Sequence, residues 1–163
     1  MCDILHNLVY ERTDDISVLS NFYCGIREMD YFIHNELEKR LRVDEKLDFF
    51  LVKRENDVVA LVAVKQSYVE FNIQTGKQTI DSLEIEYLAV RKDKQKNHIG
   101  TQIIDWIENN MEHFFSGTHI ISVRAYRDFD MDYSAVPFYK SCGFRVIAEK
   151  HPLANNVIMA KRI

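Results

Sequence analysis

Residues 84–107, EIEYLAVRKDKQKNHIGTQIIDWI, decide the fold that the rest of the chain must fit. The stretch begins as an apolar strand and continues as a basic loop, and from Ile99 onward its apolar residues recur at helical spacing. A helix that starts directly after such a loop offers unpaired backbone N–H groups and the positive end of its dipole, an arrangement that binds phosphate. The loop carries four cations against Asp93, whereas the whole chain has a net charge of -4. The stretch therefore indicates a phosphate-binding loop, with an ordinary solvated turn as the alternative.

The elements on both sides of this stretch predict a mixed sheet covered by helices. A β-hairpin is expected where two β-rich runs flank Glu55, Asn56 and Asp57, and the periodicity of apolar residues predicts the helices. The predicted strands are residues 4–13, 47–54, 58–72, 79–90, 119–126, 144–150 and 156–163, and the predicted helices are residues 26–42, 98–115 and a short segment within 134–143 that Gly143 ends. The fold class is therefore α/β of the α+β kind.

Composition favours one folded domain, residues 1–163. Hydrophobic residues make up 47% of the chain and aromatics 12%, which suffices for a core, and no repeat or flexible linker divides the sequence. With a pI near 5.9, any nucleic-acid contact needs a local basic patch. The polar N-terminus lacks a signal peptide's basic start, and no run reaches the ~20 apolar residues of a membrane span, so we expect a cytoplasmic protein.

The cysteines and histidines predict neither a disulfide framework nor a metal site. The chain has three cysteines, widely spaced and without a C-x-x-C pair, and its six histidines show no ligand spacing. Cys24 and Cys142 lack an evident histidine partner, so buried structural roles are favoured over nucleophilic ones.

A second motif, FYKSCGF at residues 138–144, narrows the function that the loop could serve. Together with LAV at residues 88–90, followed after four residues by Q-x-x-H-x-G, it makes the chain resemble the GNAT superfamily of acyl-CoA N-acyltransferases. The predicted order of strands and helices agrees with that family over nearly the whole chain. Dinucleotide-binding and P-loop glycine patterns are absent from the sequence.

The resemblance implies acetyl-CoA as co-substrate and a sheet that is splayed between its fourth and fifth strands to hold the acyl-pantetheine arm. The implied coenzyme-binding residues are Leu88, Ala89, Val90, Gln95, Lys96, Asn97, His98, Ile99, Gly100, Thr101 and Asp132. Two of them depart from the family pattern, since His98 takes the place of a glycine and Asp132 that of a common asparagine. A side chain at position 98 could crowd a phosphate or donate a hydrogen bond to it.

Acetyl transfer to an amine needs a neutral nucleophile, a polarised carbonyl and a proton for the departing thiolate. Glu84 and Glu86 share one face of a strand, so either could act as the base, although both could instead be solvated strand residues. The resemblance assigns Tyr139 as the proton donor for the thiolate. Alternatively, Tyr139 is an aromatic residue that only packs in the core. The resemblance also implies that backbone N–H groups of Leu88–Val90 polarise the carbonyl.

The acceptor is the least determined part of the prediction. The charge balance favours a small amine, a peptide or a protein amine over a nucleic acid. Residues 22–32, FYCGIREMDYF, however, resemble the F-x-C-G-x-x-x-L-D-x-F-L opening of a GNAT subgroup that includes toxins acetylating the α-amine of aminoacyl-tRNA. Aminoacyl-tRNA is therefore the alternative acceptor, and a catalytically silent acyl-CoA-binding module is the third hypothesis. We expect a monomer or a homodimer that binds no membrane.

Overall fold

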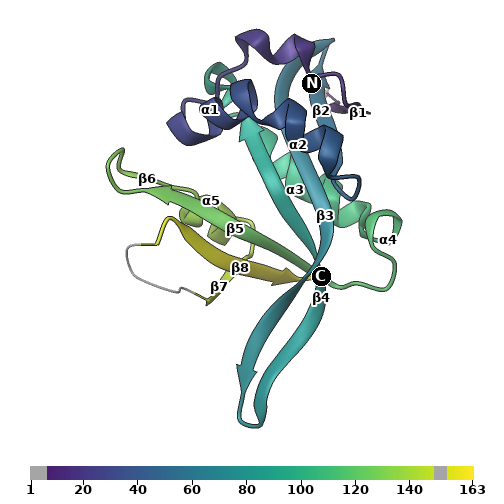
Figure 1. Ribbon diagram of the computed structural model, residues 1–163, viewed down its shortest axis with the longest axis vertical. Coiled ribbons are helices and arrows are strands. Elements are labelled where there is room, and N and C mark those ends of the chain that lie inside the picture. Colours follow the sequence, from purple (N-terminus) through teal and green to yellow (C-terminus); the bar gives the residue numbers. More distant parts are fainter. Residues whose placement is uncertain (1–6, 149–153) are drawn as a thin grey trace, which may run out of the picture. The chain divides into compact units, whose positions relative to one another are not determined.

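The computed structural model describes residues 7–148 and 154–163, and its strands form one sheet in the order β1-β2-β3-β4-β5-β8-β7, with β6 paired to β5 (Figure 1). The strands are β1 Val9–Arg12, β2 Asp48–Arg54, β3 Asp57–Ile73, β4 Gly76–Val90, β5 Ile120–Asp128, β6 Tyr133–Ser134, β7 Arg145–Ala148 and β8 Asn156–Arg162. Their pairing is antiparallel except between β4 and β5. The predicted mixed, mostly antiparallel sheet is therefore confirmed.

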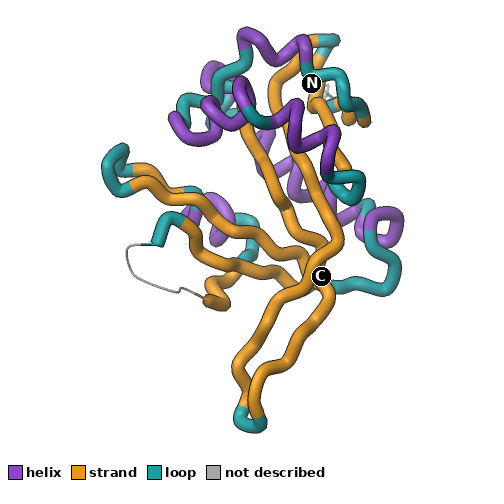
Figure 2. The backbone as a smooth tube through the Cα atoms, in the orientation of Figure 1, coloured by secondary structure: helices purple, strands orange, loops and turns teal. Residues whose placement is uncertain are grey.

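The helices fall short of the predicted lengths because two of them are interrupted. They are α1 Arg27–Asn35, α2 Leu37–Val43, α3 Ile99–Asn109, α4 Met111–Phe114 and α5 Val136–Ser141, with 3-10 turns at Ser17–Asn21 and Lys92–Lys94 (Figure 2). The single helices predicted at residues 26–42 and 98–115 are thus wrong. Within the described ranges, no helix is long and apolar enough to cross a membrane.

An asparagine side chain bonds back to the backbone at both interruptions. The Asn35 amide donates to the carbonyl of Tyr31 at 2.9 Å, and the Asn110 amide donates to that of Trp106 at 2.7 Å. At Asn110 the side chain takes the carbonyl four residues back, and the backbone N–H bonds instead to Ile107, three residues back, at 3.1 Å. The apolar periodicity continues across both breaks, so it does not reveal them.

The chain forms two compact units, Met1–Val64 with Tyr87–Ile103 and Lys65–Glu86 with Ile104–Ile163. In the first unit, α1 and α2 bury Ile33 and Leu37 in a core that they share with β2 and β3. The hairpin of β2 and β3 turns at Glu55 and Asn56, whose φ values of 52° and 65° suit a tight two-residue turn.

In the second unit, β5 pairs with one edge of β8, and β7 pairs with the other edge of β8. The parallel pairing of β4 with β5 joins Leu83–Ile85 to Ile121–Val123, and the hydroxyls of Ser82 and Ser122 are 2.8 Å apart within it. Helix α5 ends at Ser141, and Gly143, just after the helix cap, adopts a φ of 93°, which agrees with its predicted role in ending the helix. Parts of the predicted strands 4–13 and 144–150 lie outside the described residues, and a single domain over residues 1–163 stays a prediction.

Candidate active site

Arg91, at the start of the predicted phosphate-binding loop, is engaged within the protein. Its guanidinium donates to Asp57, from Nη1 to Oδ1 at 2.8 Å and from Nη2 to Oδ2 at 2.9 Å, and from Nε to Oδ1 of Asp93 at 2.6 Å. Nη1 also donates to the carbonyl of Val58 at 2.9 Å. These hydrogen bonds hold the pKa of Asp57 and of Asp93 below its usual value. The lysines of the loop are therefore the cations that remain to attract an anionic ligand.

His98 occupies a backbone conformation that favours glycine. Its φ is 60°, and Lys96 has a φ of 65°, so both residues lie in the left-handed region. The carbonyl of His98 accepts the N–H of Gln102 at 3.0 Å, which places His98 directly at the start of α3. The glycine that the family carries at this position would adopt the same φ without steric cost. The imidazole is exposed.

Gln95 holds the loop in place. Its amide nitrogen donates to the carbonyl of Cys24 at 2.6 Å and to that of Val90 at 3.0 Å. Asn97 donates to the carbonyl of Lys94 at 3.3 Å, which closes the loop on itself. Of the other predicted coenzyme-binding residues here, Lys96 and Thr101 are exposed, Gly100 is half-buried and Ile99 is buried.

The N-terminal motif at residues 22–32 builds a defined loop before α1. Asp30 accepts two backbone hydrogen bonds, from the N–H of Cys24 to Oδ1 at 2.7 Å and from the N–H of Gly25 to Oδ2 at 3.1 Å. Phe22 and Cys24 are buried in the core of the first unit, and burial raises the pKa of the Cys24 thiol to about 12. The thiol is therefore an inert core group, as the sequence predicts.

This N-terminal loop is docked on the predicted phosphate-binding loop. The N–H of Lys92 donates to the carbonyl of Tyr23 at 2.9 Å, and Gln95 donates to the carbonyl of Cys24. Gly25 has a φ of 89°, and a Cβ at this position would come within 3.2 Å of Cδ of Lys92. The two sequence motifs thus form one structure, in which glycine is strongly favoured at position 25.

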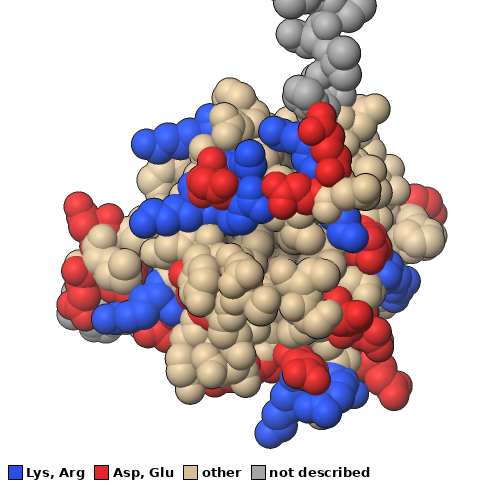
Figure 3. Space-filling view, turned by 90° about the horizontal axis from the view of Figure 1, so that it is seen from above, with Lys and Arg blue, Asp and Glu red and all other residues tan. Residues whose placement is uncertain are grey.

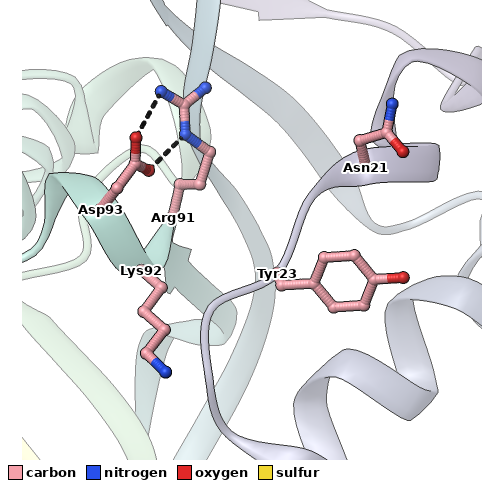
Figure 4. Close-up of a pocket in the computed structure, with 5 residues that line it drawn as sticks. All are labelled: Asn21, Tyr23, Arg91, Lys92 and Asp93. Carbon is pink, nitrogen blue, oxygen red and sulfur yellow. Dashed lines mark hydrogen bonds and ion pairs between the residues drawn. The ribbon is translucent and has the colours of Figure 1, made fainter.

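An open pocket of about 680 Å³ lies at this junction, lined by Asn21, Tyr23, Arg91, Lys92 and Asp93. Arg91 and Asp93 are joined to each other there, whereas the ammonium of Lys92 is directed away from that pair (Figure 4). Asn21 and Tyr23 come from the segment before α1. The pocket therefore combines an aromatic ring with a cation that Asp93 does not neutralise.

The second unit contains the two candidate bases on β4. Nζ of Lys65 lies 3.3 Å from a carboxylate oxygen of Glu86 and 3.8 Å from one of Glu84, and Arg124 lies 3.5 Å from Glu84. Glu84 is 8% exposed. Burial, together with the neighbouring charge of Glu86, raises the pKa of Glu84 above its usual value. A partly desolvated carboxylate with a raised pKa accepts a proton more readily than an isolated surface glutamate does.

Tyr139 lies in α5 and is buried. Its ring meets those of Phe138 and Phe144 edge to face, with centroids 5.0 Å and 5.4 Å away, and its carbonyl accepts the N–H of Phe144 at 3.0 Å. Burial raises the pKa of Tyr139 above that of a free phenol. The hydroxyl therefore stays protonated at neutral pH and can donate a hydrogen bond, but complete proton transfer to a thiolate is more uphill than for a free phenol.

The remaining predicted residues divide between the two units. Ala89 is buried and Leu88 and Val90 are half-buried at the end of β4, in the first unit. Asp132 belongs to the second unit, in the turn between β5 and β6, and has a φ of 51°, a conformation that Asp and Asn both tolerate. In the part of the chain that the structure describes, no three His, Cys, Asp or Glu side chains are grouped to hold a metal ion.

Lys65, Asp30 and Tyr23 take part in these arrangements without having been predicted as site residues. A signal for Lys65 was present in the sequence. The hairpin turns at residues 74–75. Residues equidistant from a two-residue turn face each other across a hairpin, so the ion pair of Lys65 with Glu84 could have been expected.

Comparison with known proteins identifies the family. Residues 45–146 match the model of the acetyltransferase (GNAT) domain, which is more than half of the chain, so the protein belongs to the GNAT family. It is accordingly an acetyl-CoA-dependent N-acetyltransferase. The N-terminal motif at residues 22–32 precedes the matched segment. A comparison with curated protein sequences gave no match.

Solved structures with the same fold include several that contain the protein AtaT. AtaT complexed with acetyl-methionyl-tRNAfMet is 21% identical with a TM-score of 0.70, over 93% of this chain and 94% of that one. AtaTR bound with acetyl-CoA is 23% identical with a TM-score of 0.69, over 93% and 91%. A mutant AtaT toxin bound to the C-terminus of the antitoxin AtaR is 22% identical with a TM-score of 0.70, over 93% and 90%. These likenesses establish the shared fold.

Proposed function

We propose that the protein transfers the acetyl group of acetyl-CoA to the α-amine of an aminoacyl-tRNA. The observation that carries this proposal is the docking of residues 22–25 on residues 91–95, because the sequence pattern of the tRNA-acetylating subgroup builds a defined structure here against the phosphate-binding loop. The fold that the chain shares with AtaT in complex with acetyl-methionyl-tRNAfMet supports the same class of acceptor. The proposal places aminoacyl-tRNA ahead of the small amines and peptides that the charge balance favoured.

In this proposal the coenzyme's pyrophosphate binds at the loop before α3. The backbone N–H groups at the start of a helix and the lysines of the loop supply the positive charge, because Arg91 is already paired with Asp57 and Asp93. Gln95 is a positioning residue in this proposal, because its amide fixes the loop by donating to the carbonyls of Cys24 and Val90.

The low pKa of an α-amine suits a carboxylate such as Glu84 as the base. An α-amine has a pKa near 7.8, so about one molecule in seven is neutral at pH 7 and ready to attack, whereas a lysine-type amine is neutral only about once in 2500 molecules. The base then has only to remove a proton as the carbon–nitrogen bond forms. In our proposal Glu84 accepts that proton, with Glu86 and Lys65 fixing its position.

Tyr139 completes the proposed reaction. When the carbon–sulfur bond of the thioester breaks, charge develops on the sulfur, and the phenol donates a hydrogen bond to it. Because burial raises the pKa of Tyr139, we assign the hydroxyl to stabilisation of the thiolate, and solvent delivers the final proton. The N–H groups of Leu88–Val90 would polarise the thioester carbonyl, as in the family.

The surface charge predicts how tRNA would be held. Lys and Arg alternate with Asp and Glu on the face shown in Figure 3, so no continuous basic surface covers it. Arg40 of the basic cluster in α2 pairs with Asp44 at 3.0 Å, which removes part of that cluster's charge. A few local phosphate contacts should therefore hold the tRNA, with an affinity that falls with added salt.

The test is release of free coenzyme A thiol from acetyl-CoA with a panel of acceptors. Bulk aminoacyl-tRNA should release thiol and should yield acetylated aminoacyl groups by mass spectrometry, whereas the same tRNA after deacylation should not. Free amino acids, polyamines and peptides complete the panel. Turnover of polyamines or peptides with none of aminoacyl-tRNA would refute the proposal and restore the small-amine alternative.

A further inference from the structure

Tyr23 is an exposed aromatic ring on a rigid base. It is 53% exposed, yet its ring stacks on that of His34 with centroids 4.6 Å apart and planes 26° from parallel. His34 is itself fixed, because its Nε2 donates to the carbonyl of Phe22 at 2.7 Å. The carbonyl of Tyr23 is held by the N–H of Lys92. The ring is therefore already ordered before any ligand arrives, which lowers the entropic cost of binding to it.

Lys92 lines the same pocket and supplies its cation. Its backbone is bonded to Tyr23, its side chain passes close to Gly25, and its ammonium points away from the Arg91–Asp93 pair (Figure 4). Arg91 also neutralises the acidic side of the pocket by binding Asp93 through two hydrogen bonds, at 2.6 Å and 3.2 Å. A pocket that combines an ordered aromatic face with a lysine suits a nucleotide, whose base can stack on the ring while a neighbouring phosphate pairs with the ammonium.

We propose that the pocket lined by Tyr23, Lys92 and Asn21 binds a nucleotide of the single-stranded 3′ end of the acceptor RNA, with its base stacked on Tyr23. The proposal rests on the proposed function, because a small amine would have no nucleotide to place here. It deepens that function by giving the docked N-terminal loop a direct contact with the acceptor. The amide of Asn21 can hydrogen-bond an edge of the same base, and Lys92 binds an adjacent phosphate.

The experiment compares two acceptors that share one α-amine, an aminoacyl-tRNA and the ethyl ester of the same amino acid. Tyr23→Leu should raise KM for aminoacyl-tRNA by about 5- to 150-fold, the loss expected for one stacked base. The KM for acetyl-CoA and turnover of the ester should not change. Tyr23→Phe should behave like the parent, because it keeps the ring. Tyr31→Leu removes another tyrosine, 59% exposed, and serves as the matched control.

Three results would overturn the nucleotide site. An equal loss of activity of Tyr23→Leu with both acceptors would mean that Tyr23 has only a structural role. A rise in the KM for acetyl-CoA would assign the ring to the coenzyme's adenine. Unchanged kinetics would mean that no base stacks on the ring. If the parent does not acetylate aminoacyl-tRNA at all, the proposed function fails separately. The site is then judged by the anisotropy of a labelled single-stranded RNA trinucleotide: binding that Tyr23→Leu abolishes supports the site, and no binding to the parent refutes it.

Discussion

At the scale of single residues, His98 is held in a conformation that a glycine would adopt more easily. With a φ of 60°, the imidazole-bearing residue costs about 1 kcal/mol relative to an unstrained position, partly offset by the greater freedom of glycine in the unfolded chain. His98→Gly should therefore raise the free energy of unfolding by up to about 1 kcal/mol in urea titrations. Asn97→Gly is the control, since Asn97 is not among the described residues with positive φ, and it should lose stability.

The same variant resolves what the imidazole does to the coenzyme. Calorimetry with acetyl-CoA should show tighter binding if the ring crowds the pyrophosphate and weaker binding if it donates a hydrogen bond. An unchanged affinity would contradict both ideas and leave His98 as an exposed residue that only starts α3.

Tyr139 should matter for rate rather than for binding. Tyr139→Phe removes one hydroxyl and keeps the ring that packs on Phe138 and Phe144. We expect kcat to fall by about 10²-fold or more, while the affinity for acetyl-CoA changes only a few-fold. Because burial keeps the phenol protonated, the parent's pH profile should show no ionisation of this group near neutrality. Tyr68→Phe, at an exposed position, is the control, and parental turnover by Tyr139→Phe would assign the phenol to packing alone.

Glu84 should make the protein's stability depend on pH in an unusual direction for a carboxylate. Burial raises its pKa in the folded state, so protons favour folding, and the contribution is full below the unfolded pKa and is lost as pH rises through the folded one. Glu84→Gln should thus be more stable than the parent at pH 7, by about 1 kcal/mol or less, with the difference vanishing near pH 4. Lys65 keeps its partner Glu86 in this variant. A variant that is less stable than the parent at pH 7 would mean that the ion pairs of Glu84 outweigh its desolvation.

At the scale of elements, the loop before α1 depends on one carboxylate. Asp30→Ala would leave the N–H groups of Cys24 and Gly25 without their acceptor, which costs about 1–3 kcal/mol. Because this loop is docked on residues 91–95, we also expect KM for acetyl-CoA to rise. Glu28→Ala, an exposed site on the same helix with the same charge change, is the control and should match the parent in both thermal unfolding and kinetics. Equal effects of the two substitutions would refute the anchoring role.

The strands were more predictable than the helices for a physical reason. Runs of β-branched and other apolar residues, together with the turn at Glu55 and Asn56, determine a strand locally, and the structure places β2 and β3 there. Helix ends depend on single hydrogen bonds, such as that of Asn110 to Trp106, that leave the apolar period intact. The loop at residues 91–98 was predictable as basic, but its pairing of Arg91 with Asp57 joins positions 34 residues apart and follows only from the fold.

At the scale of the whole molecule, a net charge of -4 coexists with a site that must attract a polyanionic coenzyme. Acetyl-CoA should raise the melting temperature, since a ligand at about 100 times its Kd stabilises the folded state by about 2.7 kcal/mol, which corresponds to roughly 5–10 °C for a chain of this size. Replacing Lys94 and Lys96 by Gln should reduce this shift, more at 20 mM than at 500 mM salt, because added salt screens the lysines' attraction for the coenzyme. Lys39 and Lys46, outside the loop, provide a double Gln variant with the same change in net charge, whose response to acetyl-CoA should equal the parent's. Equal losses in both double variants would mean that net charge alone governs binding, and an unchanged melting curve of the parent at millimolar acetyl-CoA would remove the loop from the coenzyme site.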